Sequence, residues 1–422
     1  MLHINKIREN KEKFIALLKI KNIDAADLIT SAITKDDERK TTQQSADELL
    51  AKGNKLAKKI GELYKTGKAD EANILKEESS SIKKESQALQ AKQAMLEKEL
   101  QEILVHIPNV PHPSVPVGKS DADNIIIKEV GTIPTLIEGA KPHWDLTNDY
   151  KLIDFELGNK ITGAGFPVYT NKGAKLQRAL ITYFLDKNIG AGYTEYLPPH
   201  VVNEASGFGT GQLPKFEEDL YKIPSDTDLY LIPTAEVPVT NFFRDVIVNE
   251  FPIKCTAYTP CFRREAGSYG KDVRGLNRLH QFDKVEIVQI QHPKKSYETL
   301  DLMVNHVASI LDELELPYRI LQLCGGDLSF ASSLTYDFEV FSAGQERWLE
   351  VSSVSNFESY QANRLKLRYK NEEGKTKLCH TLNGSALALP RIYAALLENN
   401  QTTEGIKIPQ ALQSYTGFEI IK

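Results

Sequence analysis

The sequence predicts an α+β protein, with an N-terminal antiparallel α-helical coiled-coil arm and a larger domain built on an antiparallel β-sheet flanked by helices. Three observations lead to this fold class. Apolar residues recur every seven positions in the first quarter of the chain, a proline-rich segment ends that quarter, and short strand-like runs separated by turns follow it. The 422 residues suit roughly two or three domains.

The predicted arm rests on two heptad series of apolar residues. They are Leu49, Leu56 and Leu63 in the first half and Leu75, Ile82, Leu89, Leu96 and Ile103 in the second. A strict seven-residue period is typical of a coiled coil. Between the series, Gly67 supplies a break and Asp70 is suited to cap the next helix. We therefore expect two helices of roughly 30 residues folded into a hairpin about 45 Å long. One long helix that dimerises is the alternative.

A cluster of lysines lies on the outward half of this arm and at its turn: Lys52, Lys55, Lys58, Lys59, Lys65 and Lys68. Glu62 is the only acid in that stretch. From charge alone, a solvated coiled-coil surface is the simpler interpretation, but a basic stripe on a rod also suits a phosphate backbone. The formal net charge of −5 gives no whole-protein attraction to nucleic acid, so such a partner would need this local patch.

The segment from Pro108 to Pro116 holds four prolines and cannot continue a helix. We therefore expect an N-terminal domain over residues 1–109 and a second domain over residues 110–422. The chain has neither a GxxxxGK[ST] nor a GxGxxG loop, and its four cysteines form no CxxC pair. It shows no apolar run of about 18 residues and no signal-peptide pattern at its start, so a cytoplasmic protein is expected.

The second domain contains one predicted helix, at residues 172–186, followed by strand-like runs separated mainly by turns. The runs are residues 193–197, 229–232, 254–258, 284–290, 318–323, 335–340 and 348–353. This spacing favours an antiparallel sheet over a parallel one.

The densest charged stretch of this domain lies within residues 259–290, where basic residues and Glu265 form a loop between two apolar runs. The basic residues are Arg263, Arg264, Lys271, Arg274 and Arg278. Glu286 lies inside the second apolar run, where a buried carboxylate is costly unless it meets a cation. The stretch is therefore a candidate for chemistry rather than for structure alone.

These segments resemble the motifs of class II aminoacyl-tRNA synthetases and, within that class, the seryl-tRNA synthetase family. Motif 1 resembles residues 172–186 and 192–198, and motif 2 resembles residues 262–282. Motif 3 resembles residues 384–391, as a small-residue turn leading into a helix. With the arm, the resemblance spans nearly the whole chain. It implies a six- or seven-stranded antiparallel sheet and a homodimer formed through motif 1.

The resemblance also implies an ATP-dependent, AMP-forming serine–tRNA ligase. Such an enzyme activates L-serine to seryl-adenylate and transfers serine to the 3′ end of tRNA(Ser), and whether tRNA(Sec) is also charged stays open. The arm would contact the tRNA through its six lysines. Activation is an in-line attack of the serine carboxylate on the α-phosphate, which needs positioning and charge neutralisation rather than a nucleophile.

The motif positions imply roles for individual residues. Arg263 would bridge the α-phosphate and the serine carboxylate, Arg391 would hold the γ-phosphate, and Glu350 joins them as the third catalytic residue. Glu350 and Ser353 would also hold Mg²⁺, which prefers oxygen ligands. The full implied ATP set is Arg263, Arg264, Glu265, Arg278, Leu279, Phe282, Glu350, Val351, Ser352, Ser353 and Arg391.

The implied serine site is rich in hydroxyl and carboxylate groups: Thr234, Ala235, Glu236, Glu286, Asn383 and Ser385. A site built to hydrogen-bond a hydroxyl rejects alanine, because its own polar groups would be left unpaired. No zinc is expected, since no HExxH pair occurs and the cysteines are scattered. Arg264 stands where the family commonly has a small serine.

Two rival functions stay open. One is a ligase that loads serine or another small amino acid onto a different carrier, although such an enzyme has no need of the arm. The other is a catalytically inactive synthetase-like regulatory protein, although a binding module would have no reason to keep Arg263, Glu265, Glu286 and Arg391 together.

Overall fold

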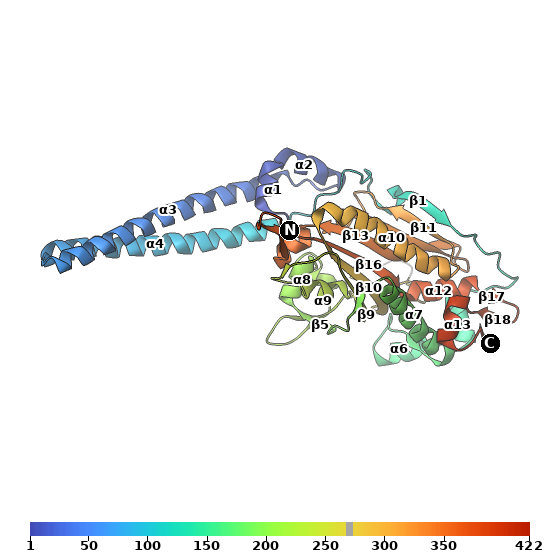
Figure 1. Ribbon diagram of the computed structural model, residues 1–422. Helices are drawn as coiled ribbons and strands as arrows, with labels where there is room; N and C mark the ends of the chain where they lie inside the picture. The colour runs from blue at the N-terminus through green and yellow to red at the C-terminus, as the bar shows by residue number, and fades with distance from the viewer. Residues whose placement is uncertain (267–272) are drawn as a thin grey trace. The chain divides into compact units, whose positions relative to one another are not determined.

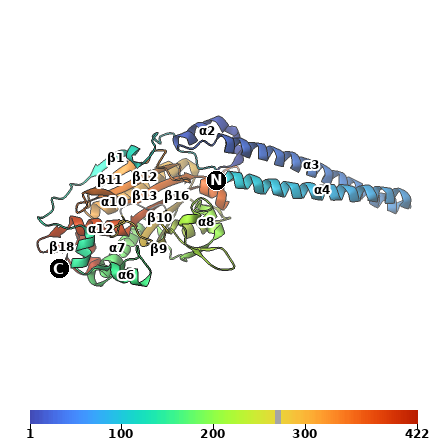
Figure 2. The ribbon, with the colours of Figure 1, turned by 180° about the vertical axis from the view of Figure 1, so that it is seen from behind.

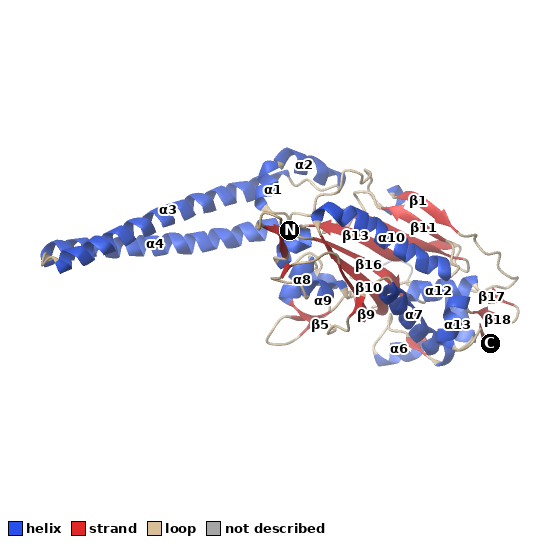
Figure 3. Cartoon of the chain, in the orientation of Figure 1, coloured by secondary structure: helices blue, strands red, loops and turns tan. Residues whose placement is uncertain are grey.

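The computed structural model describes residues 1–266 and 273–422 and divides into two compact units (Figure 1). The smaller unit comprises Leu2–Lys19 and Ile23–Pro108, and the larger comprises Met1, Ile20–Asn22 and Asn109–Lys422. Lys271 of the predicted charged loop lies outside the described residues. Long helices make up the smaller unit and a mostly antiparallel sheet with helices makes up the larger, so the predicted α+β fold class is confirmed (Figure 3).

The smaller unit contains two short helices, α1 (Ile4–Glu9) and α2 (Lys11–Ile20), and two long ones, α3 (Ala26–Lys65) and α4 (Ala69–Leu104). The long helices run side by side and are joined by a short turn (Figure 1 and Figure 2). The predicted hairpin is therefore confirmed, and one continuous helix is excluded. With 40 and 36 residues, the two helices are longer than predicted, about 60 and 54 Å at 1.5 Å per residue.

The seven-residue pattern becomes the seam of this hairpin. Ile82 and Leu96 of the predicted series are buried, and so are Ser86 and Leu100, which follow them by four residues each on the companion seam. The extra length of α3 arises because burial continues to its N-terminal end, at Ile29. The pattern in the sequence thus marks the interface of the two helices, while their ends depend on neighbouring helices.

The turn of the hairpin contains Gly67 with φ +78°, a backbone conformation that glycine adopts without strain. The expectation that Asp70 caps the second helix is wrong, because α4 begins at Ala69 and Asp70 lies inside its first turn. There the charge of Asp70 still favours the positive end of the helix dipole.

The base of the arm is tied together by Asp36, a fully buried carboxylate of α3. Arg8 of α1 donates to it at 2.8 Å, and Arg39 and Lys40 of α3 contact it at the same distance. Burial by itself would raise the pKa of Asp36, but these three hydrogen-bonded cations lower it to about 2. Asp36 therefore stays ionised and links α1 to α3.

Among the described residues, the larger unit is built on an eight-stranded sheet. Its order is β1 (Ile125–Val130), β11 (Tyr318–Gln322), β12 (Leu334–Ser342), β13 (Arg347–Glu358), β16 (His380–Ala388), β10 (Gln281–Gln291), β9 (Ile253–Phe262) and β4 (Thr194–Glu195). Neighbouring strands are antiparallel, except β4 and β9, which are parallel. The implied six or seven strands are too few, because β1 and β4 extend the sheet at its two edges.

Side chains of β10 show how the two faces of the sheet differ. Val285 and Ile287 lie in the main core, which also includes residues of α7 (Asn171–Gly190), α10 (Ser296–Glu313) and α12 (Leu389–Asn399). Val288 packs instead with Ala235 and Val239, next to and within α9 (Glu236–Asn241). Since side chains alternate along a strand, Glu286 shares the face of Val288. The three long helices thus cover one face, and the other is free to form a site.

Smaller elements complete the larger unit. Its other helices are η1 (Asp121–Asp123), α5 (His143–Asp149), α6 (Phe155–Ile161), α8 (Glu204–Thr210), η2 (Glu217–Asp219), η3 (Pro293–Lys295), α11 (Tyr360–Leu365) and α13 (Gln410–Thr416). Its other strands are β2 (Ile153–Asp154), β3 (Val168–Tyr169), β5 (Val201–Asn203), β6 (Lys222–Ile223), β7 (Leu229–Leu231), β8 (Ile247–Val248), β14 (Arg368–Lys370), β15 (Thr376–Leu378), β17 (Gln401–Thr402), β18 (Gly405–Lys407) and β19 (Ile420–Ile421).

The predicted small-residue turn at residues 384–388 is wrong, because these residues form the end of β16 and the helix begins only at Leu389. A central strand made of glycine, serine and alanine lacks the β-branched residues that signal a strand. Its position explains the composition: a Cβ atom on Gly384 would lie 3.1 Å from Val354 of the neighbouring β13. Close packing between strands therefore selected small residues there.

Candidate active site

A cavity of about 680 Å³ lies in the larger unit. Strands β9 and β10 deliver the motif 2 residues to it, β13 and β16 supply its floor, and α9 and α12 contribute one charged side chain each. The predicted site residues that line it are Thr234, Glu236, Arg263, Glu265, Arg278, Leu279, Phe282, Glu286, Glu350, Val351, Ser352, Ser353, Asn383, Ser385 and Arg391.

One end of the cavity is a buried polar pocket centred on Glu286 of β10. The register places Glu286 directly opposite Ser385 of β16, so both side chains enter the pocket. Glu286 is almost fully buried, and its Oε2 lies 2.7 Å from Nζ of Lys284 and accepts from the Thr234 hydroxyl at 3.1 Å. Lys284 is therefore the cation that a carboxylate in this apolar strand requires.

A second carboxylate, Glu236 at the start of α9, lies in the same pocket. Its Oε1 accepts from Nε2 of Gln361 at 2.6 Å, and Oε1 of Gln361 in turn accepts from the Thr381 hydroxyl at 2.7 Å. Burial, and next the charge of Glu286, raise the pKa of Glu236 to about 7. The pocket thus holds two carboxylates with different partners, suited to an ammonium group and a hydroxyl.

The other end of the cavity carries the arginines of the charged loop. Arg263 directly follows β9, and its guanidinium carbon lies 5.1 Å from the ring centroid of Phe282, the second residue of β10. Nη1 of Arg278 donates to Oε2 of Glu265 at 2.5 Å. Because β9 and β10 are hydrogen-bonded neighbours, their ends hold the base of the loop in place.

Arg391, in the first turn of α12, reaches this end of the cavity from the opposite side. Its Nη1 donates to the carbonyl oxygen of Glu350 at 2.7 Å, and its Nε donates to the carbonyl oxygen of Asn277 at 3.2 Å. These two acceptors are neutral, and the Glu350 carboxylate lies at the longer distance of 3.8 Å, so part of the positive charge stays available for an anion. The cavity therefore combines an anion-binding end with a carboxylate-rich end.

An acidic spot lies between the two, at the face shared by β12 and β13. Asp337 of β12 is opposite Ser353 of β13, and the Ser353 hydroxyl lies 3.5 Å from Oε1 of Glu350. Oδ1 of Asp337 is buried and has no hydrogen-bond partner among the described residues. Burial and the nearby Glu350 raise the pKa of Asp337 well above its usual value. The pairing of oxygen ligands with an orphaned carboxylate oxygen suits a divalent cation.

Two predicted residues, Ala235 and Arg264, are not part of the cavity lining. The side chain of Ala235 is fully buried in a small apolar cluster with Val239 and Val288. Arg264 donates its backbone N–H to the carbonyl oxygen of Asp219 at 2.9 Å.

Among the residues of the cavity region that escaped the sequence interpretation are Lys284, Asp337 and Gln361. A signal existed for Lys284, which lies two residues before Glu286 and so on the same face of the strand. A weaker one existed for Asp337, which alternates with the buried Phe338 and Val340. Nothing local marks Gln361, which meets Glu236 only through the fold.

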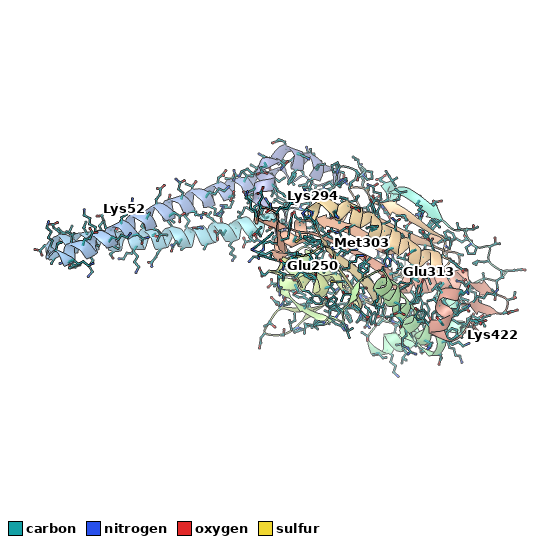
Figure 4. All side chains as sticks on the ribbon, viewed as in Figure 1. Lys52, Glu250, Lys294, Met303, Glu313 and Lys422 are labelled. Carbon is teal, nitrogen blue, oxygen red and sulfur yellow. The ribbon has the colours of Figure 1, made fainter. Side chains whose placement is uncertain are left out.

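The predicted arm lysines all lie exposed on α3 or at the hairpin turn, and Lys52 projects from the helix surface (Figure 4). Acidic residues of α4 lie near some of these lysines, in addition to Glu62 within their own stretch of sequence. Lys52 pairs with Glu78 of α4 at 3.0 Å, and Lys68 pairs with Glu71 at 3.2 Å. In the described part of the chain, the other four form no ion pair. Those four are Lys55, Lys58, Lys59 and Lys65.

Two family models match the chain. The first 111 residues match the seryl-tRNA synthetase N-terminal domain, and residues 216–400 match the class II tRNA synthetase core domain of the G, H, P, S and T enzymes. Across residues 1–266 and 273–422, no helix has the length and apolar character needed to span a membrane.

Relatives that match the chain over its full length are serine–tRNA ligases. The chain is 48% identical to a serine–tRNA ligase of Salinibacter ruber, over 99% of this chain and 98% of the relative. It is 45% identical to the serine–tRNA ligase of Delftia acidovorans, over 100% and 99%. Among solved structures, the seryl-tRNA synthetase of Pyrococcus horikoshii complexed with ATP is similar, with a TM-score of 0.92, 34% identity and coverage of 100% and 99%. The cytoplasmic serine–tRNA ligase of Naegleria fowleri in complex with AMP has a TM-score of 0.88, 27% identity and the same coverage.

Proposed function

Because the chain belongs to the seryl-tRNA synthetase family of class II aminoacyl-tRNA synthetases, we propose that it activates L-serine with ATP and transfers the serine to tRNA. The resemblance predicted from the motifs is thereby confirmed. The observation that carries the proposal is one cavity with two ends: a pocket of carboxylates and hydroxyls beside a set of arginines. A small polar amino acid and a nucleoside triphosphate can meet there.

For serine, we propose that the pocket at Glu286 receives the amino acid. Thr234 and Ser385 supply hydroxyl groups, Asn383 supplies an amide, and Glu236 supplies a second carboxylate. A carboxylate buried next to a hydroxyl can accept hydrogen bonds from both the ammonium and the side-chain hydroxyl of serine. Alanine leaves these groups unpaired, so we expect the pocket to reject it by about 10⁴-fold.

For ATP, we propose the implied set around Arg263, Phe282 and Arg391. A planar guanidinium fork suits both a phosphate and a carboxylate, so Arg263 can hold the two reacting groups together. Arg391 donates to two carbonyl oxygens and forms a long ion pair, at 3.8 Å, with the Glu350 carboxylate, so it keeps charge for the outer phosphates. Arg278 supplies a further phosphate contact, and Glu265, which pairs with it, accepts from the adenine amino group.

The residues around Glu350 fit a magnesium ion. The orphaned oxygen of Asp337 is an observation in favour, because a buried unpaired carboxylate oxygen is costly unless a cation meets it. We propose that Glu350 and Ser353 hold the ion. When bound, Mg²⁺ supplies positive charge that neutralises the phosphates of ATP.

For tRNA, we propose that residues 1–109 form the tRNA-binding domain and residues 110–422 the catalytic domain. The exposed lysines of α3 can neutralise phosphates, by backbone contact rather than base reading. A homodimer through α7 and β4, a cytoplasmic location and tRNA(Ser) as the partner complete the proposal. The dimer, the location and the choice of tRNA(Ser) rest on the family resemblance. The contact of the arm with tRNA rests in addition on its exposed lysines, four of which form no ion pair among the described residues.

The test is ATP–pyrophosphate exchange with a panel of amino acids. We expect serine alone to support fast exchange, because the pocket pairs a hydroxyl with buried polar groups. Faster exchange with alanine, threonine or proline would contradict the serine assignment. A protein that exchanges with none of them would instead be the inactive regulatory relative, and one that exchanges but charges no tRNA would be a ligase for another carrier.

A further inference from the structure

Next to the arginine end of the cavity lies a buried polar cluster that the proposed reaction does not use. Its centre is Glu398 near the end of α12, paired with His143 at the start of α5, and both side chains are fully buried. Oε1 of Glu398 accepts from the backbone N–H of His143 at 2.8 Å, from Nδ1 of His143 at 2.7 Å and from Nε2 of Gln345 at 3.2 Å. The Ser342 hydroxyl donates to Oε2. The carboxylate is thus fully satisfied by donors.

The other ring nitrogen of His143 has a different task. Nε2 accepts the backbone N–H of Leu276 at 2.8 Å. An imidazole nitrogen that accepts a hydrogen bond carries no proton, so the ring proton lies on Nδ1 and points at Glu398. Glu398 therefore fixes the tautomer of His143 that can hold Leu276. A carboxylate orients metal-binding histidines in the same way.

The backbone held by His143 is pressed close to the ring. A Cβ atom on Gly275 would lie 2.2 Å from Nε2 of His143, and Gly275 has φ +63°. The neighbours of His143 hold the same loop: the Arg274 guanidinium carbon lies 4.6 Å from the ring centroid of Trp144 and one of its nitrogens 3.9 Å from Asp145. The first three residues of α5 thus all contact residues 274–276.

This contact lies at the point where the chain enters the arginine end of the cavity. Residues 276–279 line the cavity. The Asn277 carbonyl accepts from Arg391, the Asn277 amide donates to Gln345 at 3.0 Å, and Arg278 pairs with Glu265. The segment is thus fixed at its start by His143 and determines where Arg278 and Arg391 point.

We propose that His143 and Glu398 form a positioning relay that holds residues 276–279, and through them Arg278 and Arg391, in the geometry that binds the triphosphate of ATP. The inference rests on the proposed ATP site. Neither side chain touches the cavity, so both act through the segment. The relay links α12, which carries Arg391 at one end and Glu398 at the other, to the loop of motif 2.

The two nitrogens of His143 can be tested separately. In His143→Gln the side-chain oxygen can reach the place of Nε2 and accept from Leu276, whereas His143→Asn reaches only the place of Nδ1 and keeps the contact with Glu398. Each variant loses one buried hydrogen bond. We expect His143→Asn to raise the KM for ATP in serine-dependent pyrophosphate exchange about tenfold. His143→Gln should stay within about threefold of wild type, and the KM for serine should change less than about twofold in both.

Two further variants make the outcome decisive. Tyr318→Phe removes a partly buried hydrogen bond to Asp312, away from the cavity, and should lower the melting temperature without changing the KM for ATP. Equal effects of the two His143 variants, or equal increases in both KM values, would show a merely structural role and overturn the relay. If His143→Asn does not fold, Glu398→Gln replaces it: the KM for ATP should rise about threefold, and an unchanged value would overturn the relay. A wrong proposed function can be told apart from a wrong relay, because in that case the wild-type protein itself shows no serine-dependent pyrophosphate exchange.

Discussion

The arm and the sheet unit treat charged residues in opposite ways. On α3, four lysines project from a helix without an ion pair in the described part of the chain, and that stretch is held to α4 mainly by its apolar seam. In the sheet unit, Glu286, Glu236 and Glu398 are buried and each is held by defined hydrogen-bond or ion-pair partners. Exposed charges suit a screened contact with a flexible polyanion, whereas buried charges fix the orientation of a small substrate. The difference predicts that the two units fail in separable ways.

The largest effect is expected at the arginines of the cavity. Arg391→Ala or Arg263→Ala should reduce pyrophosphate exchange by about 100-fold or more, since removing one preorganised contact to developing charge costs about 3 kcal/mol. Binding of tRNA should stay near wild type, because the arm is untouched. Arg368→Ala in β14, outside the cavity, is the matched control. Near-normal exchange in either cavity variant would refute its assigned role.

The opposite pattern is expected when the arm tip is removed. Replacing residues 54–70 by a short Gly-Ser turn should leave exchange unchanged within about twofold, while aminoacylation of tRNA(Ser) falls about 10- to 100-fold through weaker binding. The salt dependence of tRNA binding should flatten, because a protein that makes fewer phosphate contacts releases fewer counterions when it binds.

A charge-only variant sharpens this test. Changing Lys55, Lys58, Lys59 and Lys65 to glutamine keeps the helices and should reproduce most of the loss, whereas changing the paired Lys52 and Lys68 should matter less. Charging that survives both the truncation and the four substitutions would mean that the arm does not read the tRNA.

Asp36 gives the arm its own buried charge. Its pKa is lowered to about 2 from a usual 3.8, so its stabilisation is present above pH 4 and is lost as the pH falls toward 2. Asp36→Asn should cost about 2 kcal/mol locally, seen at neutral pH as about thirtyfold faster amide exchange in α1 and the start of α3. Asp37→Asn, at an exposed residue that also pairs with Arg8, should change the amide hydrogen exchange rate of these helices by less than about threefold. Equal effects of the two would disprove the anchor.

The smallest effect is expected from the pH response of the serine pocket. Glu236 has a pKa raised to about 7, so it is mostly protonated below that pH, and the neutral form loses the charge attraction that strengthens its hydrogen bond to an ammonium group. Between pH 8 and pH 6 the KM for serine should rise about tenfold while the KM for ATP stays nearly constant. Glu236→Gln should abolish the dependence, and a pH response that persists in that variant would assign it to another group.

The hairpin and the charged stretch of motif 2 were predictable because their signals are local. A seven-residue repeat can be recognised within one continuous stretch of sequence, and Gly67 marks the turn. Much of the candidate site was likewise predictable from motifs, since each residue lies at a fixed position relative to an element that is itself easy to identify. The helix lengths and the strand at residues 384–388 were not, because neighbouring elements decide them. Gly384 is small because Val354 lies against it.

By itself, the sequence determined which residue types are available and in which local element each one stands. Only the tertiary structure decided which of them meet: Lys284 with Glu286 and Thr234, Gln361 with Glu236, and His143 with both Glu398 and Leu276. The physical reason is that a buried polar group needs partners wherever the fold brings them. Such partners can lie more than 100 residues apart in the sequence, as in the His143–Leu276 contact.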